Sequence, residues 1–492
     1  MKNILETVKK DFTLDPQNWD NMRKLGHQMI DDMMNYLENI SKEPVWRKIP
    51  DEAKYFLDQD IPKQPQEIEE IYDEFKQFIL PYNKGNIHPR FFAWVQGTGT
   101  PFGMLAEMLA AGMNPNTGIG EHAAMYVDRQ VVEWCKQMMN YPKAASGILL
   151  SGASMANVTA LTVARNHQLK KNVRKEGLKT MTGQMLIYCS TETHSCLQKA
   201  AEVLGLGTDA IRKISVDEKY KINISELTQA IEKDMAAGNM PFCIVANAGT
   251  VNTGAIDPLD ELIAVSKKYN LWLHVDGAFG ALAKLVPEYA APLKGIEQAD
   301  SVAFDLHKWM YMPYEIGCVL IKNAEAHRNA FSVTPNYLMQ EKRGLAGGPD
   351  AVNNYGLELS RGFKALKVWM CLKENGLEKY IELIRQNIAQ AFYFGELVKM
   401  ENDLELITPV TMNIVCYRYK KEEYNNEELN NLNKEILIQL QEQGIASPSS
   451  TILGNKFAIR LAITNHRTKK SDLELLIKET KKIGNKLSEN WQ

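Results

Sequence analysis

The chain has 492 residues, 45% of them hydrophobic and 24% charged, which is the composition of a soluble globular protein with two or three domains. Its 57 basic and 60 acidic residues leave a net charge of -3, so we expect neither a nucleic acid nor a membrane as partner. The longest apolar runs are shorter than the ~18 residues of a membrane span, and the stretch MKNILETVKKDF is not typical of a signal peptide.

Residues 1–85 predict an N-terminal helical segment. The stretches NWDNMRKLGHQMIDDMMNYLENI and PQEIEEIYDEFKQFILPY repeat apolar residues at helical spacing. A proline-rich link, DIPKQPQ, separates them. We expect this segment to pack its apolar face on something larger.

Residues 86–370 predict a large α/β domain. Short apolar runs such as GILLS, QMLIYCS and PFCIVANAGT alternate with helical stretches, which is typical of a mainly parallel sheet with helices on both faces. Residues 371–492 mix long helices with short strands and predict a small α+β domain. Before this domain, SVTPNYLMQEKRGLAGGPDAVNNYG predicts a long loop without regular structure.

The stretch from Ser151 to Ser154, SGAS, joins a predicted buried strand to a predicted helix. Small residues let backbone N–H groups approach a ligand, and a helix start carries partial positive charge, so the turn suits a phosphate group. It has neither the lysine of a P-loop nor the spacing of a dinucleotide-binding motif. An ordinary helix start with a serine cap explains the same residues.

Two more polar residues follow predicted strands. His194, after QMLIYCS, could bind a metal, act as a base or stack on an aromatic ring, although no H-x-x-H spacing supports a metal. Asp276 ends the apolar strand LWLHVD, and a carboxylate at the ligand-facing end of a strand could pair with a protonated ring nitrogen. A core or capping histidine and a helix-capping aspartate are the structural alternatives.

The heptapeptide DLHKWMY, residues 305–311, places Lys308 between two further apolar runs. A partly desolvated amine near other cations has a lowered pKa and can attack a carbonyl carbon, whereas a polar hairpin turn is the alternative. A phosphate cradle, a carboxylate, a stacking imidazole and a Schiff-base lysine are together the groups that bind pyridoxal 5'-phosphate (PLP). The combination therefore predicts a PLP enzyme.

Seven cysteines are scattered along the chain without a C-x-x-C pair. Neither a zinc site nor a disulfide framework follows from this pattern. We expect reduced core cysteines, no bound metal and a cytoplasmic location.

These residues lie in motifs that resemble those of the group II PLP-dependent amino acid decarboxylases, closest in character to aromatic-L-amino-acid decarboxylases. The resemblance covers about residues 86–375 and rests on NIHPRFFAW, SGASMANVTALTVARN, THS, NAGTVNTGAIDP, LHVDGAFG and HKW. It implies a PLP-dependent transferase fold (fold type I) with a mainly parallel seven-stranded sheet. It also implies a homodimer with the active site at the subunit interface, across which the N-terminal segment packs.

The resemblance further implies roles for individual residues. Lys308 would hold PLP as an aldimine, Asp276 would pair with the pyridinium nitrogen and His194 would stack on the ring. The other residues implied to contact the cofactor are Ala153, Ser154, Thr250, Ala278, Asp305 and His307. Tyr337 matches a loop tyrosine of the family and would donate the proton to Cα; a tyrosine that only anchors the loop is the alternative.

The substrate side is expected around Trp94 and Gln96, in RFFAWVQGTGTP. Trp94 favours an aromatic amino acid such as tyrosine, DOPA, tryptophan or phenylalanine. Arg361 matches a family arginine and would lie near the substrate, bracing Asp257 or the cofactor surroundings, unless it is a surface residue. Polar neighbours keep an acidic or small polar substrate open (aspartate, glutamate or cysteine sulfinate), and aldehyde synthesis on the same fold is a second alternative.

Overall fold

The computed structural model describes residues 13–169, 173–178, 183–333, 341 and 343–489. It divides the chain into two compact units, Met1–Lys84 and Gly85–Gln492. The domain predicted for residues 371–492 stays a prediction. Within the described residues, no helix is long and apolar enough to cross a membrane.

The first unit is helical, as the periodicity of its apolar residues predicts. Its helices are α2 (Trp19–Asn39), α3 (Asp51–Leu57) and α4 (Ile68–Glu74), and short 3-10 and π segments follow α2 and α4. Helix α2 begins where the side chain of Asn18 accepts hydrogen bonds from the backbone N–H groups of Asp20 and Asn21.

The second unit contains a seven-stranded sheet in the order β2-β8-β7-β6-β5-β3-β4. Its strands are β2 (Ser146–Leu150), β3 (Met185–Ser190), β4 (Ile211–Ile214), β5 (Met240–Asn247), β6 (Trp272–Asp276), β7 (Ser301–Asp305) and β8 (Gly317–Ile321). Only β8 runs antiparallel to its neighbours, β2 and β7, among these strands. The mainly parallel sheet predicted from the sequence is confirmed.

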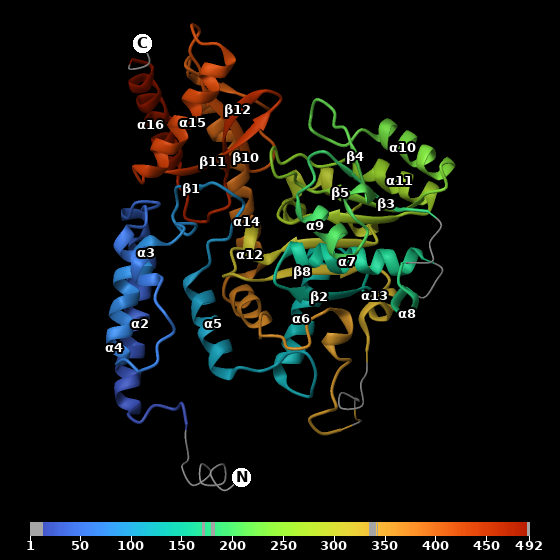
Figure 1. Cartoon of the computed structure of the whole chain (residues 1–492), viewed down its shortest axis with the longest axis horizontal. Coiled ribbons are helices and arrows are strands. Elements are labelled where there is room, and N and C mark those ends of the chain that lie inside the picture. Colours follow the sequence, from blue (N-terminus) through green and yellow to red (C-terminus); the bar gives the residue numbers. More distant parts are fainter. Residues whose placement is uncertain (1–12, 170–172, 179–182, 334–340, 342, 490–492) are drawn as a thin grey trace. The chain divides into compact units, whose positions relative to one another are not determined.

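Helices cover this sheet on both faces, since its strands are buried on both. Along β6, Leu273 and Val275 enter one apolar core and Trp272 enters the other. Helix α7 lies across the sheet (Figure 1). The helices of this part are α5 (Pro101–Met113), α6 (Ala123–Met138), α7 (Ala153–Gln168), α8 (Val173–Glu176), α9 (Cys196–Val203), α10 (Ile224–Ala236), α11 (Leu259–Tyr269), α12 (Leu306–Trp309) and α13 (Ala324–Phe331).

A second sheet has five strands in the order β1-β11-β12-β10-β9. They are β1 (Phe91–Phe92), β9 (Leu404–Leu406), β10 (Ile414–Tyr419), β11 (Ser447–Leu453) and β12 (Lys456–Ala462), and the helices around them are α14 (Ala365–Met400), α15 (Asn426–Glu442) and α16 (Lys470–Glu489). Figure 1 shows the long helix α14 running from the larger sheet to this one. In this sheet β1 pairs with β11. Phe91 lies beside Ser447, although the two residues are more than three hundred positions apart in the sequence.

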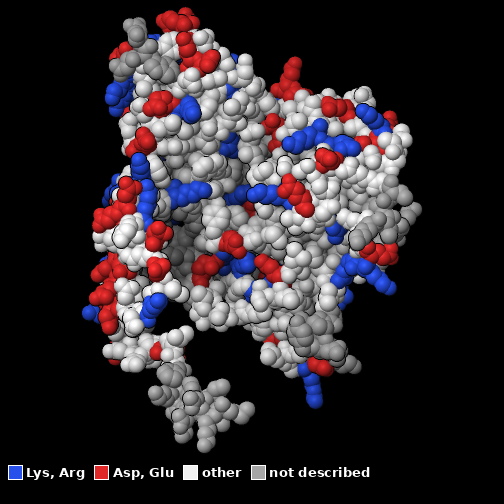
Figure 2. All heavy atoms as spheres, in the orientation of Figure 1, with Lys and Arg blue, Asp and Glu red and all other residues white. Residues whose placement is uncertain are grey.

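The charged surface matches the nearly balanced composition. On the face shown in Figure 2, basic and acidic side chains are interspersed.

Candidate active site

Lys308 lies on α12, the short helix that directly follows β7. Its Nζ is 2.8 Å from Oδ2 of Asp305, and its side chain is 21% exposed. Burial alone would lower the pKa of Lys308, but the carboxylates of Asp305 and Asp276 outweigh burial and raise it. The amine is therefore held as an ammonium ion by carboxylates until another group engages it.

Asp276 ends β6, the strand next to β7, and is buried. Its Oδ1 accepts a hydrogen bond from the backbone N–H of Ala278 at 3.1 Å. Its Oδ2 accepts from Nδ2 of Asn157 at 2.9 Å and from the thiol of Cys196 at 3.7 Å. All three partners are neutral donors, so the site presents a buried carboxylate whose charge suits a cationic ligand.

His194 follows β3, and its Nδ1 accepts a hydrogen bond from the backbone N–H of Cys196 at 3.1 Å. The residue is exposed, yet the imidazole lies deep enough that lost solvation lowers its pKa. The charges of Asp276 and Lys308 both act on this pKa, in opposite directions. The fold thus brings Lys308, Asp276 and His194 into one site, from the ends of three different strands.

The SGAS turn packs against α12. A Cβ atom added to Gly152 would lie 3.1 Å from Cε1 of His307, and one added to Gly317 would lie 2.5 Å from Oδ1 of Asp305. Such close approach needs glycine on both sides. Ser154 is exposed in the first turn of α7, where a helix start favours an anion.

Asp305 and Ala153 are engaged with each other. The backbone N–H of Ala153 donates to Oδ1 of Asp305 at 2.7 Å, and Asp305 is 1% exposed. Since a carboxylate repels phosphate, this geometry favours Asp305 as the partner of Lys308 and of the turn. The expectation that Asp305 contacts the cofactor stays a prediction.

The hydrogen bonds of His307 indicate which ring nitrogen carries its proton. Its Nδ1 accepts a hydrogen bond from the backbone N–H of Ile316 at 3.0 Å, and burial lowers its pKa. The neutral ring therefore carries its proton on Nε2, on the side that faces Asp305. Its ring also packs on Tyr314, with 4.5 Å between ring centroids.

Thr250 and Ala278 contribute to the site through hydrogen bonds to neighbouring residues. The buried hydroxyl of Thr250 lies 3.0 Å from that of Thr253 and accepts from the backbone N–H of Ala255 at 3.0 Å. Ala278 holds Asp276 through its N–H group. These contacts shape the turn after β5 and orient the carboxylate.

The segment with Trp94 and Gln96 runs beside α12. A Cβ atom on Gly97 would fall 1.6 Å from the carbonyl oxygen of His307, and the N–H of Gly97 donates to the hydroxyl of Tyr314 at 3.2 Å. Trp94 is 51% exposed. This placement agrees with a substrate side near Trp94.

Arg361 does not contact Asp257, which was one of the two places expected for it. Its Nη2 donates to the carbonyl oxygen of Leu149 at 2.9 Å and is 3.5 Å from Asp128. Asp257 instead accepts hydrogen bonds from the backbone N–H groups of Ile222 and Asn247. Arg361 therefore braces β2 and not Asp257. Tyr337 lies outside the described residues.

Several residues of the site were missed in the sequence. Asn157 and His274 contact Asp276 directly or through one another, and a signal existed: His274 is two positions before Asp276 in a strand, so both share a face. Arg460 is a second case. It is buried, burial lowers its pKa to about 10, and its Nη2 has no hydrogen-bond partner among the described residues.

The donor set fits PLP. Lys308 supplies an amine for the aldehyde, and Asp276 supplies a buried negative charge for the protonated ring nitrogen. His194 supplies an exposed imidazole, and Ser154, in the first turn of α7, supplies a donor for a phosphate group. Among the described residues, no cluster of three or more His, Cys, Asp or Glu side chains could hold a metal ion.

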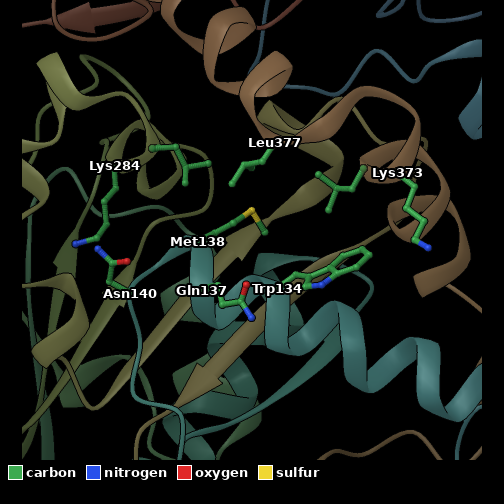
Figure 3. A pocket seen from close by; sticks show the side chains of 9 residues that line it. Trp134, Gln137, Met138, Asn140, Lys284, Lys373 and Leu377 are labelled. Carbon is green, nitrogen blue, oxygen red and sulfur yellow. The ribbon is translucent and has the colours of Figure 1, made fainter.

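A separate cavity of about 450 Å³ lies between α6, α14 and the segment around Lys284. Figure 3 shows Met138 and Leu377 on its walls, Lys284 beside Asn140 at one end and Lys373 directed away at the other. Lys284 pairs with Glu297 at 2.7 Å, and Lys373 lies 4.2 Å from the ring centroid of Trp369. Both cations of this cavity are already engaged.

Comparisons with known proteins agree with this geometry. Residues 50–420 match the family model described as the pyridoxal-dependent decarboxylase conserved domain. The chain is 33% identical to an aromatic-L-amino-acid decarboxylase of Bacillus atrophaeus, over 95% of this chain and 96% of that protein. It is 31% identical to tyrosine decarboxylase 4 of Petroselinum crispum, over 92% and 90%.

The fold is also that of a solved structure. The crystal structure of Oryza sativa TDC with PLP and tryptamine superposes with a TM-score of 0.88 at 24% identity, covering 96% of this chain and 100% of that one. The predicted fold type I architecture is confirmed.

Proposed function

Because the chain belongs to the family of pyridoxal-dependent decarboxylases, we propose that it converts an aromatic L-amino acid to its amine and carbon dioxide. The enzyme class and the cofactor, PLP, follow from the family. The substrate class is the proposed part. The observation that carries it is Trp94, a half-exposed aromatic side chain on the segment packed against the Lys308 helix.

When bound, PLP supplies an aldehyde carbon and an electron-poor ring that accepts the electron pair of the breaking Cα–carboxylate bond. Lys308 would hold the aldehyde through Nζ, with the carboxylate of Asp305 beside it to take up a proton. Asp276 would keep a proton on the ring nitrogen by its buried negative charge. His194 would cover one face of the ring and limit the access of water to it.

Other side chains hold the remaining groups. Ser154 would donate to the phosphate group from the first turn of α7. We propose Tyr337 as the residue that delivers a proton to Cα after carbon dioxide leaves. A phenol at this position favours decarboxylation to an amine over aldehyde formation, because aldehyde formation does not add that proton to Cα.

Arg460 is the one observation that supports the alternative function, decarboxylation of an acidic amino acid. Its Nη1 donates to the carbonyl oxygen of Ala93, next to Trp94, while Nη2 has no hydrogen-bond partner within the part of the chain that the structure describes. A buried cation with an open N–H favours an anionic group. Every amino acid offers an α-carboxylate for it, and an acidic amino acid offers a second one.

The test is a substrate screen with the purified protein and PLP. We expect carbon dioxide and one equivalent of amine from tyrosine, DOPA, tryptophan or phenylalanine, and far less from aspartate, glutamate or cysteine sulfinate. Lys308→Ala should lower the rate at least about a thousandfold, and Lys294→Ala, at a lysine away from the site, should not. Turnover of acidic substrates alone, or aldehyde with peroxide in place of amine, would refute the proposal.

We also propose a homodimer in the cytoplasm. Helix α5 begins five residues after Gln96, and its apolar side chains Met108, Leu109 and Met113 are 48%, 46% and 61% exposed. An exposed apolar face of this kind supports a subunit interface beside the active site. All seven cysteines are free and buried, which supports a reducing compartment.

A further inference from the structure

Asp276 is held by more than its own strand. We propose that a one-way chain of hydrogen-bond donors positions Asp276 and keeps its carboxylate an acceptor for the protonated ring nitrogen of the cofactor. We call this set the donor chain; it consists of Trp272, Ser301, His274 and Asn157. The inference rests on the proposed function, because it assigns Asp276 to the cofactor ring.

The donor chain is continuous in space. Nε1 of Trp272 donates to Oγ of Ser301 at 2.8 Å, and Oγ of Ser301 is 2.8 Å from Nδ1 of His274. Nε2 of His274 is 2.7 Å from Oδ1 of Asn157. Nδ2 of Asn157 donates to Oδ2 of Asp276 at 2.9 Å.

The sheet register explains why these residues meet. Trp272, His274 and Asp276 alternate along β6 and so share one face, and His274 lies directly opposite Ser301 of β7. Asn157 lies on α7, which crosses that face. Two strands and one helix therefore fix the chain, and none of its members lies in a loop.

The ends of the donor chain indicate its direction. The indole of Trp272 can only donate, so the hydroxyl of Ser301 accepts from it and is free to donate to His274. At the other end, the amide of Asn157 faces Asp276 with Nδ2 and His274 with Oδ1. This orientation calls for a proton on Nε2 of His274, and Nδ1 is then the acceptor for Ser301.

The environment keeps this direction unchanged. His274 is 0% exposed, and burial lowers its pKa to about 4, so its ring stays neutral. Cys196 lies 3.1 Å from Nδ2 of Asn157, and burial raises the pKa of its thiol to about 12, so it too faces Asp276 as a donor. The donor chain thus runs from the indole N–H at one end to the Asp276 carboxylate at the other.

The consequence concerns the acceptor atoms of Asp276. Its Oδ2 faces the hydrogen that the amide of Asn157 donates, and its Oδ1 faces the N–H of Ala278. Turning the amide of Asn157 over would lose the bond of Oδ1 to His274. The donor chain therefore presents Asp276 as an acceptor, which suits a protonated ring nitrogen.

The first test needs no cofactor. Nitrogen-15 NMR of the histidine-labelled protein, without PLP, should show His274 as the neutral Nε2–H tautomer down to about pH 5, with its signal assigned by its loss in His274→Gln. A Nδ1–H tautomer would overturn the proposal. The tautomer is read from the unsubstituted protein, and the His274→Gln variant serves only to assign the signal.

The second test uses PLP labelled with nitrogen-15 in the ring. His274→Leu and Asn157→Leu remove a donor and should move the ring-nitrogen shift toward the unprotonated value, with Kd for PLP raised about tenfold or more. His274→Gln keeps an N–H at the Nε2 position and an acceptor for Ser301, so it should restore both readouts. A purely structural role would lower thermal stability but leave the nitrogen shift unchanged.

The outcomes separate this inference from the proposed function. An unchanged shift and Kd in folded His274→Leu would refute the donor chain. Normal PLP binding without turnover of any aromatic amino acid would refute the proposed substrate class and leave the donor chain standing, because neither readout uses a substrate.

Discussion

Arg361 and Asp128 form an ion pair that is almost fully withdrawn from water. Their side chains are 1% and 2% exposed, and Nη2 of Arg361 is 3.5 Å from Oδ2 of Asp128. Burial raises the pKa of Asp128 even though the charge of Arg361 opposes this. Nε of Arg361 has no hydrogen-bond partner among the residues that the structure describes. The pair is therefore costly to break, because either charge alone would be stranded.

Replacing one partner should show this cost. We expect Arg361→Met to lower the free energy of unfolding by about 3–5 kcal/mol, measured by urea denaturation, because Asp128 is left buried without a cation. The double variant Arg361→Met with Asp128→Leu should recover most of the loss. Arg23→Met, which breaks the exposed pair with Asp20, should change stability by less than about 1 kcal/mol. Equal losses of stability in Arg361→Met and Arg23→Met would contradict this account.

The sequence allowed some site residues to be predicted and hid others, for a physical reason. Lys308, Asp276 and His194 stand at strand ends, where chain order and apolar runs already place a side chain at the ligand edge of a sheet. Asn157 and Arg361 are reached only through packing between a helix or loop and a distant strand. A polar residue in a helical stretch does not reveal which strand it will face.

At the scale of elements, the segment from Trp94 to Gly97 and helix α12 share a surface without room for a side chain. The Cβ of an alanine at position 97 would meet the backbone carbonyl of His307, and backbone atoms cannot rotate away. The segment and the Lys308 helix can therefore pack this closely only because residue 97 has no side chain.

Gly97→Ala should therefore impair catalysis through misplacement. We expect kcat/KM to fall about a hundredfold, since displacements of about 1 Å at a reacting centre have effects of this size. Amine release at varied substrate concentration measures it. Gly362→Ala is the matched control, because nothing lies within 4 Å of its added Cβ. A Gly97→Ala protein as active as this control would show that the segment is free to move.

Element types followed from periodicity, but strand direction did not. The alternation of apolar runs and helical stretches predicted the mainly parallel sheet, which is confirmed. The antiparallel β8 follows from the short connection through α12, because a parallel return needs a longer crossover. Helix α14 also contains Gly376 at φ 68°, a break that a run of helix-forming residues around a single glycine does not reveal.

For the whole molecule, the proposed dimer predicts a defined effect of charge on α5. Met108→Glu with Met113→Glu should convert a dimer into a monomer in sedimentation velocity and reduce activity, because two charges would have to be buried in the interface. Val203→Glu introduces the same charge on α9, at a side chain that is 74% exposed, and should leave both unchanged. A double variant that stays dimeric would place the interface elsewhere.

Acid should destabilise the whole fold through buried histidines. Burial lowers the pKa of His274, His327 and His466 from 6.5 to about 4. Between these values the unfolded chain takes up protons that the folded chain refuses, so stability falls as pH decreases from 6.5 to about 4. Each histidine contributes up to about 3 kcal/mol to this loss.

Urea unfolding at a series of pH values measures the effect. His327→Gln should make the decline shallower by roughly a third of its total, whereas His27→Gln, at an exposed position of α2, should leave the slope as it is. Identical slopes for all three proteins would mean that other groups govern acid unfolding.

The short α12 connection has a consequence for how the protein takes up its cofactor. The backbone N–H groups of Leu306 and His307 both donate to the carbonyl of Ile316, and β7 and β8 pair on either side. Amide hydrogens there should exchange with deuterium only when the entire sheet comes apart. PLP would thus bind to a preformed site, and its loss would leave that site folded and able to bind PLP again.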